Sequence, residues 1–444
     1  MERVLSFDHT PTLSVPLRFF LSAPLFAAGA ALLLLWQGPE ALASRWSPVT
    51  LALTHLMTLG VLASVMTGAL LQILPVVFGA SIPRPDATAS LIHLGLTLGT
   101  VALVAAFLLQ KPVLFQIAIV LLLLGLGSFA AIGIAALWRM PGKNDMLTTV
   151  RLSLVSLVAT IVLGSTAAAM FAWPQAEGHP LVPPLPVTDL TNLHASWGLL
   201  GWVGLLIAGI AYQVVPMFQV TPQYPGRFTR LFARALFLLL VMWSLLVALT
   251  PERPLFIKLV LTEFLYGGYV SFALTTLYLL WQRKRPKPDP TTLFWRLALC
   301  NLLACIGCWI IGELLPQVAN APAFAVVLGV MFIVGFAFSV VNGMLYKIVP
   351  FLVWYHLQNS SQPGGVRAPN VKQVLPDNMA QGQFYVHVAA FVLLLGAAVW
   401  PHALARIAAI AMACSCGWLW WNLLVAVGVY RKCRTEMEAR AKPA

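Results

Sequence analysis

The chain has 444 residues, of which 60% are hydrophobic and 9% are charged, and its formal net charge is +13. This composition excludes a soluble globular domain and is typical of a polytopic membrane protein. Membrane proteins collect Lys and Arg in their inner loops, so the positive charge does not by itself indicate a nucleic-acid partner.

Apolar runs long enough to cross a membrane recur along the whole chain. They lie at 15–36, 48–76, 88–109, 112–138, 149–173, 191–218, 228–249, 255–281, 292–315, 321–355, 383–400 and 403–430. These runs predict an all-α polytopic membrane protein of about twelve transmembrane helices. We expect one transmembrane domain over 1–444 and no soluble domain.

The basic residues indicate how these helices are oriented. With both termini inside, only Arg45, Lys111, Arg253, Lys258 and Arg406 of the 27 basic residues remain on the outer side. This distribution follows the positive-inside rule, so it explains the net charge without a nucleic-acid partner. We therefore predict a multi-pass protein of a bacterial cytoplasmic membrane, with both termini in the cytoplasm.

One stretch occurs three times, as MTGALLQILPVVF ending at Phe78, IAGIAYQVVPMF ending at Phe218 and VNGMLYKIVPFL ending at Leu352. Each copy has a glycine seven residues before a proline and a polar residue three before it: Gly68, Gln72 and Pro75; Gly209, Gln213 and Pro216; Gly343, Lys347 and Pro350. The copies lie in the second, sixth and tenth predicted helices. They predict three four-helix repeats, at approximately 15–138, 149–281 and 292–430.

Another glycine lies eight residues upstream in every copy, at Gly60, Gly201 and Gly335. In two copies a serine stands midway between the glycines, at Ser64 and Ser339. Small residues at this spacing allow helix backbones to approach closely within lipid. We therefore expect close helix packing along these stretches.

Two histidines lie early in matching helices of the repeat, His55 in the second and His194 in the sixth. Ionisable residues inside a membrane are costly and are functional candidates. The pair is predicted to face a shared cavity as axial heme ligands or as part of a copper site, and Met331 is a candidate for His/Met ligation. The alternative is that each histidine donates to a neighbouring carbonyl and that Met331 is a core residue.

Further polar residues are expected near the inner ends of the helices or within them. The candidates for an inner polar vestibule or a proton path are Gln72, His93, Gln213, Glu263, Lys347, His356 and His387. The histidines are equally consistent with ordinary interfacial positions. Glu263, the deepest carboxylate, is equally consistent with an interhelical hydrogen bond from a protonated acid.

The segments THLMTLGVLASVMTGALLQILP and LHASWGLLGWVGLLIAGIAYQVVP carry a family resemblance. With the three four-helix arcs, they resemble subunit I of the heme-copper oxidase superfamily, above all its nitric oxide reductase-like branch. The resemblance implies that His55 matches a low-spin heme ligand and that His194 matches a copper ligand. The first helix, RFFLSAPLFAAGAALLLLW, is also similar to heme- and copper-containing membrane proteins linked to nitrogen-oxide respiration.

The chain departs from this family in its ligand set. The seventh helix lacks the paired histidines of the copper site, and the tenth lacks the histidines that bind both hemes. A complete centre for reducing oxygen or nitric oxide cannot be built from this chain. If the protein is an enzyme, the resemblance implies an oxidoreductase related to cytochrome c oxidase or nitric oxide reductase, with unknown catalytic residues.

The sequence thus predicts a heme-binding membrane protein, with copper as a second candidate cofactor, that acts in respiratory electron transfer or nitrogen-oxide response. The candidate partners are the lipid bilayer, a cytochrome c or quinone electron donor and a respiratory complex. The alternative is a cofactor-free transporter or channel, or an assembly subunit, on the same scaffold.

Overall fold

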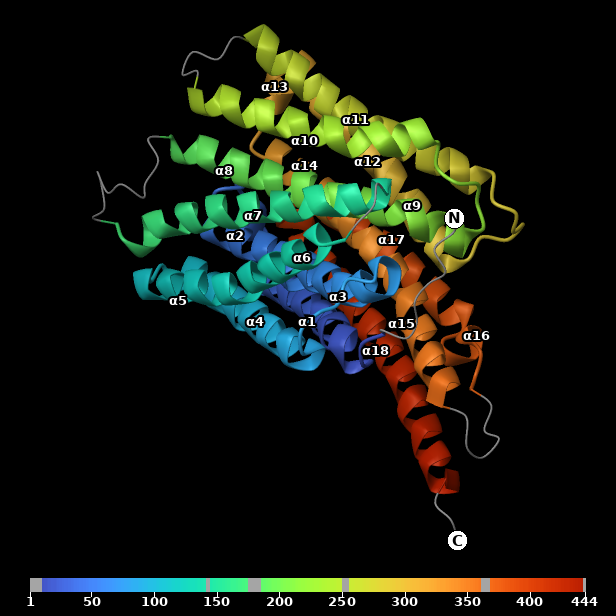
Figure 1. Cartoon of the computed structure of the whole chain (residues 1–444). Helices are drawn as coiled ribbons and strands as arrows, with labels where there is room; N and C mark the ends of the chain where they lie inside the picture. Colours follow the sequence, from blue (N-terminus) through green and yellow to red (C-terminus); the bar gives the residue numbers. More distant parts are fainter. Residues whose placement is uncertain (1–9, 141–143, 175–184, 250–254, 361–367, 442–444) are drawn as a thin grey trace. The chain divides into compact units, whose positions relative to one another are not determined.

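A computed structural model describes residues 10–140, 144–174, 185–249, 255–360 and 368–441 (Figure 1). Helices make up 88% of the structure, and no strand occurs among these residues. Twelve described segments are long and apolar enough to cross a membrane: Ser14–Leu42, Pro48–Phe78, Pro85–Leu109, Pro112–Trp138, Asp145–Ala172, Val187–Gln219, Gly226–Leu249, Phe256–Trp281, Pro290–Leu314, Phe324–Asn359, Asp377–Val399 and Pro401–Ala439. The protein is an all-α polytopic membrane protein, as predicted.

The chain forms two compact units, of which unit 1 contains Ala69–Pro286 and Leu299–Asn320. Its elements are α4 (Pro85–Leu109), α5 (Pro112–Leu122), η4 (Leu123–Gly127), α6 (Ser128–Trp138), α7 (Asp145–Ala172), α8 (Val187–Ala195), η5 (Ser196–Gly204), α9 (Leu205–Gln219), α10 (Gly226–Leu249), α11 (Leu255–Trp281) and α13 (Pro316–Ala319). Within this unit α7 packs against α5, α6, α8, η5, α9 and α10. Helix α7 therefore lies at the centre of the contacts that hold unit 1 together.

Unit 2 contains Pro11–Gly68, Lys287–Ala298 and the chain from Ala321 onward. Its elements are α1 (Ser14–Gln37), η2 (Gly38–Leu42), α2 (Pro48–His55), η3 (Leu56–Ala63), α14 (Phe324–Val330), η6 (Met331–Phe338), α15 (Ser339–Ser360), α16 (Val371–Val374), α17 (Asp377–Val399) and α18 (Pro401–Ala441). Helices α3 (Ser64–Phe78) and α12 (Pro290–Leu314) pass from one unit to the other. Helix α18, the long red helix of Figure 1, packs against α1, α15 and α17, and η3 packs against α1 and η6.

The second, sixth and tenth spans each contain a π-helical stretch, in which backbone hydrogen bonds reach five residues instead of four. These stretches are η3, η5 and η6, and they contain the upstream glycines Gly60, Gly201 and Gly335 respectively. The matching register supports the predicted repeat. The boundaries of the two units do not coincide with those of the three repeats, so the repeat stays a prediction.

The carbonyl directly before each of these glycines accepts a hydroxyl hydrogen bond. Ser64 Oγ donates to Leu59 O at 3.3 Å, and Ser339 Oγ donates to Val334 O at 3.1 Å. In the sixth span Leu200 O accepts instead from the Tyr269 hydroxyl of α11. Each of these carbonyls also accepts the backbone N–H five residues later, from Ser64, Leu205 and Ser339, so the hydroxyl supplies a second hydrogen bond.

The glycines of the repeat meet two kinds of neighbour. In the sixth span a Cβ at Gly201 would lie 2.8 Å from Cβ of Ser156, and one at Gly209 would lie 2.8 Å from Cγ2 of Thr149, as expected of close helix packing; in the second and tenth spans the neighbours are aromatic. A Cβ at Gly60 would lie 2.5 Å from the ring of Phe26, and one at Gly343 would lie 2.5 Å from Cβ of Phe294. These glycines therefore make room for aromatic side chains. Close backbone approach occurs elsewhere, between α4 and η4, where a Cβ at Gly95 would lie 2.7 Å from the backbone nitrogen of Gly125.

Two helices extend well beyond their apolar runs, since α18 continues to Ala441 past the run that ends at 430, and α17 starts before its run. The eleventh helix was expected at 383–400, but α17 begins at Asp377 because the polar segment DNMAQGQ is helical and continuous with the apolar run. His387 is therefore ten residues into α17, and its side chain is fully buried. The place of His387 in an inner vestibule stays a prediction.

Candidate cofactor ligands and buried polar groups

His55 is the last residue of α2 and directly precedes the π-helical stretch η3. Its Nδ1 lies 2.8 Å from Leu51 O, one helical turn earlier, and its side chain is half-buried. A carbonyl only accepts hydrogen bonds, so this contact assigns the proton to Nδ1 and the lone pair to Nε2.

His194 lies near the end of α8, just before η5. Its Nδ1 lies 3.1 Å from Thr160 O of α7. A Cβ at Gly164 would be 2.6 Å from Cε1 of His194, so the imidazole rests against the backbone of α7 where no side chain intervenes. The Thr160 carbonyl assigns the Nδ1 proton in the same way as Leu51 does for His55.

His55 belongs to unit 2 and His194 to unit 1. Both make the carbonyl bond that the packing alternative requires. A metal-bound histidine makes the same bond, because the carbonyl orients the ring and fixes its tautomer. The bond alone is therefore compatible with both interpretations, and the predicted shared cavity stays a prediction.

Met331 is the first residue of η6 and is 5% exposed. Every residue of η6 is buried, and η6 packs against η3, the stretch that follows His55. The imidazole of His55 thus lies just before η3, the thioether of Met331 lies at the start of η6, and these two π-helical stretches contact each other within unit 2.

The predicted inner polar residues fall in both units. Gln72, His93, Gln213 and Glu263 belong to unit 1, whereas Lys347, His356 and His387 belong to unit 2. Gln72 is 8% exposed, and its Oε1 makes no hydrogen bond within the described chain. Gln213 is exposed, and His93 and His356 are half-buried. The predicted vestibule stays a prediction, because its residues are distributed over two units.

Lys347 forms an ion pair with Asp289, a residue that sequence reasoning missed. Lys347 Nζ lies 2.5 Å from Asp289 Oδ2, with the two side chains 19% and 15% exposed. Asp289 Oδ1 also accepts from the backbone nitrogen of Thr292 at 2.9 Å and from its hydroxyl at 2.8 Å, as a cap at the start of α12. The sequence signal was an Asp followed by Pro at the start of an apolar run.

The charge of Asp289 is stabilised by these contacts. Burial raises the pKa of the Asp289 carboxyl, but the Lys347 ammonium and the hydrogen bonds from Lys347 and Thr292 outweigh burial and hold this pKa below its usual value. The carboxylate form is therefore favoured, and Lys347 is held at the start of α12.

Unit 2 also contains buried carboxamides that sequence reasoning did not single out. Asn342 of α15, Gln383 of α17 and Asn422 of α18 have side chains that are fully buried. Each is a lone carboxamide within or beside an apolar run, which is the signal that could have identified it. His387 of α17 is a further fully buried polar side chain, and its Nε2 lies 2.8 Å from Ser339 Oγ.

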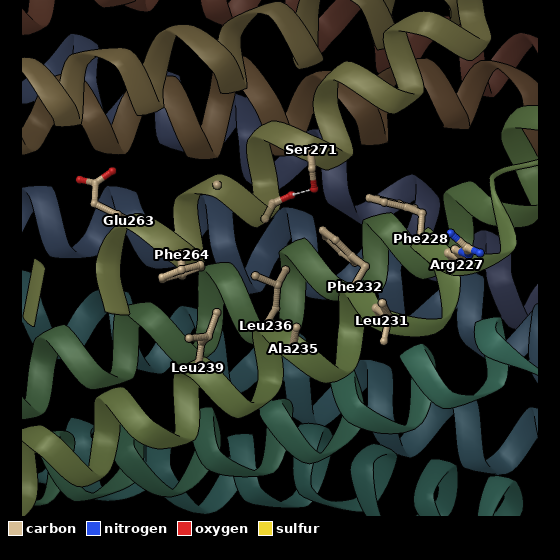
Figure 2. Close-up of a pocket in the computed structure, with 12 residues that line it drawn as sticks. Arg227, Phe228, Leu231, Phe232, Ala235, Leu236, Leu239, Glu263, Phe264 and Ser271 are labelled. Carbon is tan, nitrogen blue, oxygen red and sulfur yellow. Dashed lines mark hydrogen bonds between the residues drawn. The ribbon is translucent and has the colours of Figure 1, made fainter. Parts of the chain in front are cut away.

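Glu263 lines a groove between α10 and α11 in unit 1, shown in Figure 2. The groove has a volume of about 670 Å³ and is lined mainly by Phe, Leu, Ala and Gly, with Glu263 and Arg227 as its charged residues. Glu263 is exposed on α11. A proton path through Glu263 and an interhelical hydrogen bond from Glu263 both stay predictions.

No group of three or more His, Cys, Asp or Glu residues arranged to hold a metal ion occurs in the described part of the chain. The six cysteines are free thiols.

Comparison with known proteins adds no family assignment. No protein-family model and no curated protein matches this chain. The class that the fold defines is a multi-pass membrane protein whose surface contacts the lipid bilayer.

Proposed function

We propose that the protein is an integral membrane heme protein of the oxidase subunit I-like type. It acts in respiratory electron transfer or in the response to nitrogen oxides, and copper is its second candidate metal. The observation that supports this proposal is the shared geometry of His55 and His194, whose Nδ1 atoms both meet a backbone carbonyl. This contact leaves the lone pair on Nε2, the atom that would bind iron or copper.

The donor set is compatible with heme. His55 and Met331 of unit 2 flank η3 and η6, which pack against each other, and His/Met ligation is one of the known axial pairs for heme iron. His194 is the donor available in unit 1. A bound heme would supply a one-electron redox couple, while Leu51 and Thr160 orient the two imidazoles through their carbonyls.

Visible spectroscopy tests this function directly. The full-length protein is purified in mild detergent from heme-sufficient cells, and oxidised and dithionite-reduced spectra are recorded with iron and copper analysis. We expect a Soret band with sharp reduced α and β bands. His55→Ala and Met331→Leu should each alter these bands, His55→Ala with His194→Ala should abolish heme retention, and His402→Ala, at an exposed position, should leave the spectrum unchanged. A colourless, metal-free protein would overturn the proposal.

We also propose that both termini face the cytoplasm of a bacterium and that a cytochrome c, a quinone or a respiratory complex supplies the electrons. The distribution of Lys and Arg supports the orientation. Fluorescence of a green fluorescent protein fused after Ala444 is expected, because this reporter folds on the cytoplasmic side. Activity of a periplasmic phosphatase at the same site would contradict the orientation.

The second candidate is a cofactor-free transporter or channel for protons or a small anion. It is favoured by the partly buried Lys347 and Asp289 pair and by the unpaired Oε1 of buried Gln72. In proteoliposomes its flux should fall in Lys347→Met and should persist in Lys372→Gln, an exposed lysine. Flux that is indifferent to both Lys347 and Glu263 would rule out this candidate.

A further inference from the structure

Buried polar side chains form a ring that joins α15, α17 and α18 in unit 2. His387 Nε2 contacts Ser339 Oγ at 2.8 Å, and Asn422 Nδ2 donates to the Tyr346 hydroxyl at 3.0 Å. Gln383, one helical turn before His387, donates through Nε2 to Ser415 Oγ at 3.1 Å. All of these side chains are less than 9% exposed, so bulk solvent does not satisfy their remaining hydrogen-bonding atoms.

Five atoms of this ring have no hydrogen-bond partner in the described chain. They are Nδ2 and Oδ1 of Asn342, Oε1 of Gln383, Nδ1 of His387 and Oδ1 of Asn422. Asn342 lies three residues after Ser339 and four before Tyr346, which puts all three on one face of α15. The unpaired atoms therefore belong to one seam between the three helices.

The existing bonds show which of these atoms are acceptors. Gln383 Nε2 donates to Ser415 O at 3.2 Å, and Asn422 Nδ2 donates to Met379 O at 3.3 Å, so the oxygens of both amides remain acceptors. Ser339 Oγ and His387 Nε2 share one hydrogen bond in which either atom can be the donor, so His387 Nδ1 is an acceptor in one tautomer and a donor in the other.

The ring thus has three unpaired amide oxygens, one unpaired amide nitrogen and the unpaired Nδ1 of His387. Buried polar atoms almost always have a protein or water partner, because leaving them unpaired is costly. A water molecule donates two hydrogen bonds and accepts two, so it satisfies both kinds of atom without adding charge. A cation would satisfy only the acceptors, and no carboxylate bonds to the ring to balance its charge; Asp289 in the same unit is already paired with Lys347.

We propose that this ring is a hydration site within the membrane-spanning part of unit 2, where ordered water molecules bind Asn342, Gln383, His387 and Asn422. The site is independent of heme, since none of these residues is a candidate ligand. The bound waters complete the hydrogen bonds of the polar side chains that join the three helices.

Hydroxyl-radical labelling tests the site on the full chain in lipid nanodiscs. A millisecond X-ray pulse generates radicals from water, bound water included, and the labelled residues are found by mass spectrometry. Phe294 is the reporter, because its ring centroid lies 5.4 Å from that of His387, 6.2 Å from Tyr346 and 4.9 Å from Phe384. Phe20 is the matched control, since both phenylalanines are fully buried in the same unit.

We expect Phe294 to be labelled at least severalfold more than Phe20, and equal labelling of the two would overturn the proposal. Ammonium or potassium chloride at high concentration should leave the labelling of Phe294 unchanged, whereas its suppression would identify a cation as the occupant instead. Asn342→Leu should reduce the labelling and lower the melting temperature. A higher melting temperature in this variant would show that the ring is dry, and Thr100→Val, which removes a buried hydroxyl bonded within α4, controls for loss of a polar group.

Discussion

The two units differ in the side chain that donates a hydroxyl hydrogen bond to the carbonyl before each π-helical glycine. In unit 2 the carbonyl before the π-helical glycine accepts from a serine of its own span, Ser64 in one span and Ser339 in the other. In unit 1 the matching carbonyl of Leu200 accepts from Tyr269, which comes from another helix. The bond is local in unit 2, whereas in unit 1 it fixes α11 against η5.

The unit 1 arrangement requires space that the unit 2 arrangement does not need. A Cβ at Gly204 would lie 2.3 Å from the Tyr269 hydroxyl oxygen, so only glycine leaves room for the tyrosine ring. A serine reaches a carbonyl of its own helix without help from a neighbour. The same π-helical register can thus be stabilised by a serine within the span or by a tyrosine of a neighbouring helix. Mutations of these residues should distinguish the local bond from the tertiary one.

The largest expected effect is that of Gly204→Val, which fills the space of Tyr269. It should destabilise the protein by ~3 kcal/mol, because it overfills the space beside Tyr269, forces the ring away and breaks its bond to Leu200 O. Chemical unfolding in detergent measures the effect. Gly307→Ala, where a Cβ meets nothing within 4 Å, is the control and should be neutral or slightly stabilising. A harmless Gly204→Val would show that Tyr269 does not depend on this glycine.

The next effect concerns the ion pair in unit 2 between Lys347 of the tenth span and Asp289 at the start of α12. Asp289→Asn should cost about 2 kcal/mol near neutral pH, since it removes a charge-assisted bond. The folded pKa of Asp289 lies below its usual value. The contribution is therefore complete above the unfolded pKa, about 4, and is lost as the pH falls through the folded pKa.

Unfolding measured over a range of pH checks this prediction. The difference in stability between the wild-type protein and Asp289→Asn should shrink as the medium becomes acidic. Lys372→Gln breaks a pair with Asp377 whose side chains are 77% and 46% exposed, so it should change little at any pH. A difference that stays constant down to the lowest pH would mean that the carboxylate charge does not matter.

A smaller effect is expected for Tyr269→Phe, which keeps the ring and removes only the hydroxyl. The bond from the Tyr269 hydroxyl to Leu200 O is lost, although this oxygen keeps the backbone N–H of Leu205, and the expected cost is ~1 kcal/mol in the same unfolding assay. Tyr278→Phe on the same helix is the control, because Tyr278 is 56% exposed. Equal behaviour of the two variants would place the stabilisation of η5 elsewhere.

The smallest effects should separate the two serines of unit 2. Ser64→Ala removes a single long bond within one span and should cost about 0.5 kcal/mol. Ser339→Ala removes the bond to Val334 and the contact with His387, so about 1 kcal/mol is expected. Identical values would indicate that His387 gains nothing from Ser339.

The sequence predicted the number and approximate location of the spans because each is a long apolar run. It misjudged the start of α17, where polar residues continue a helix without an apolar signal. It located the glycines of the repeat but not the phenylalanines beside Gly60 and Gly343, since the spacing of small residues does not reveal whether a backbone or a phenylalanine occupies the space. The π-helical stretches have no local sequence signature and appear only in the hydrogen bonds.

The candidate site was predicted in part. His55 and His194 were identified from their depth, and their carbonyl bonds match the packing alternative as well as the ligand hypothesis. Asp289 was missed because its partner Lys347 is 58 residues away. Asn342 was overlooked because pairing in a buried seam depends on three helices that are distant in sequence.

Helix α18 has one further consequence, which follows from its 41 residues. At ~1.5 Å per residue it is about 60 Å long, roughly twice the thickness of the hydrocarbon core of a bilayer. The apolar first half fits the lipid, whereas the turns after Tyr430, which carry Arg431, Lys432 and Arg434, extend into water. The last turns of α18 are therefore a charged helical surface outside the bilayer, which a soluble protein could contact without entering the lipid.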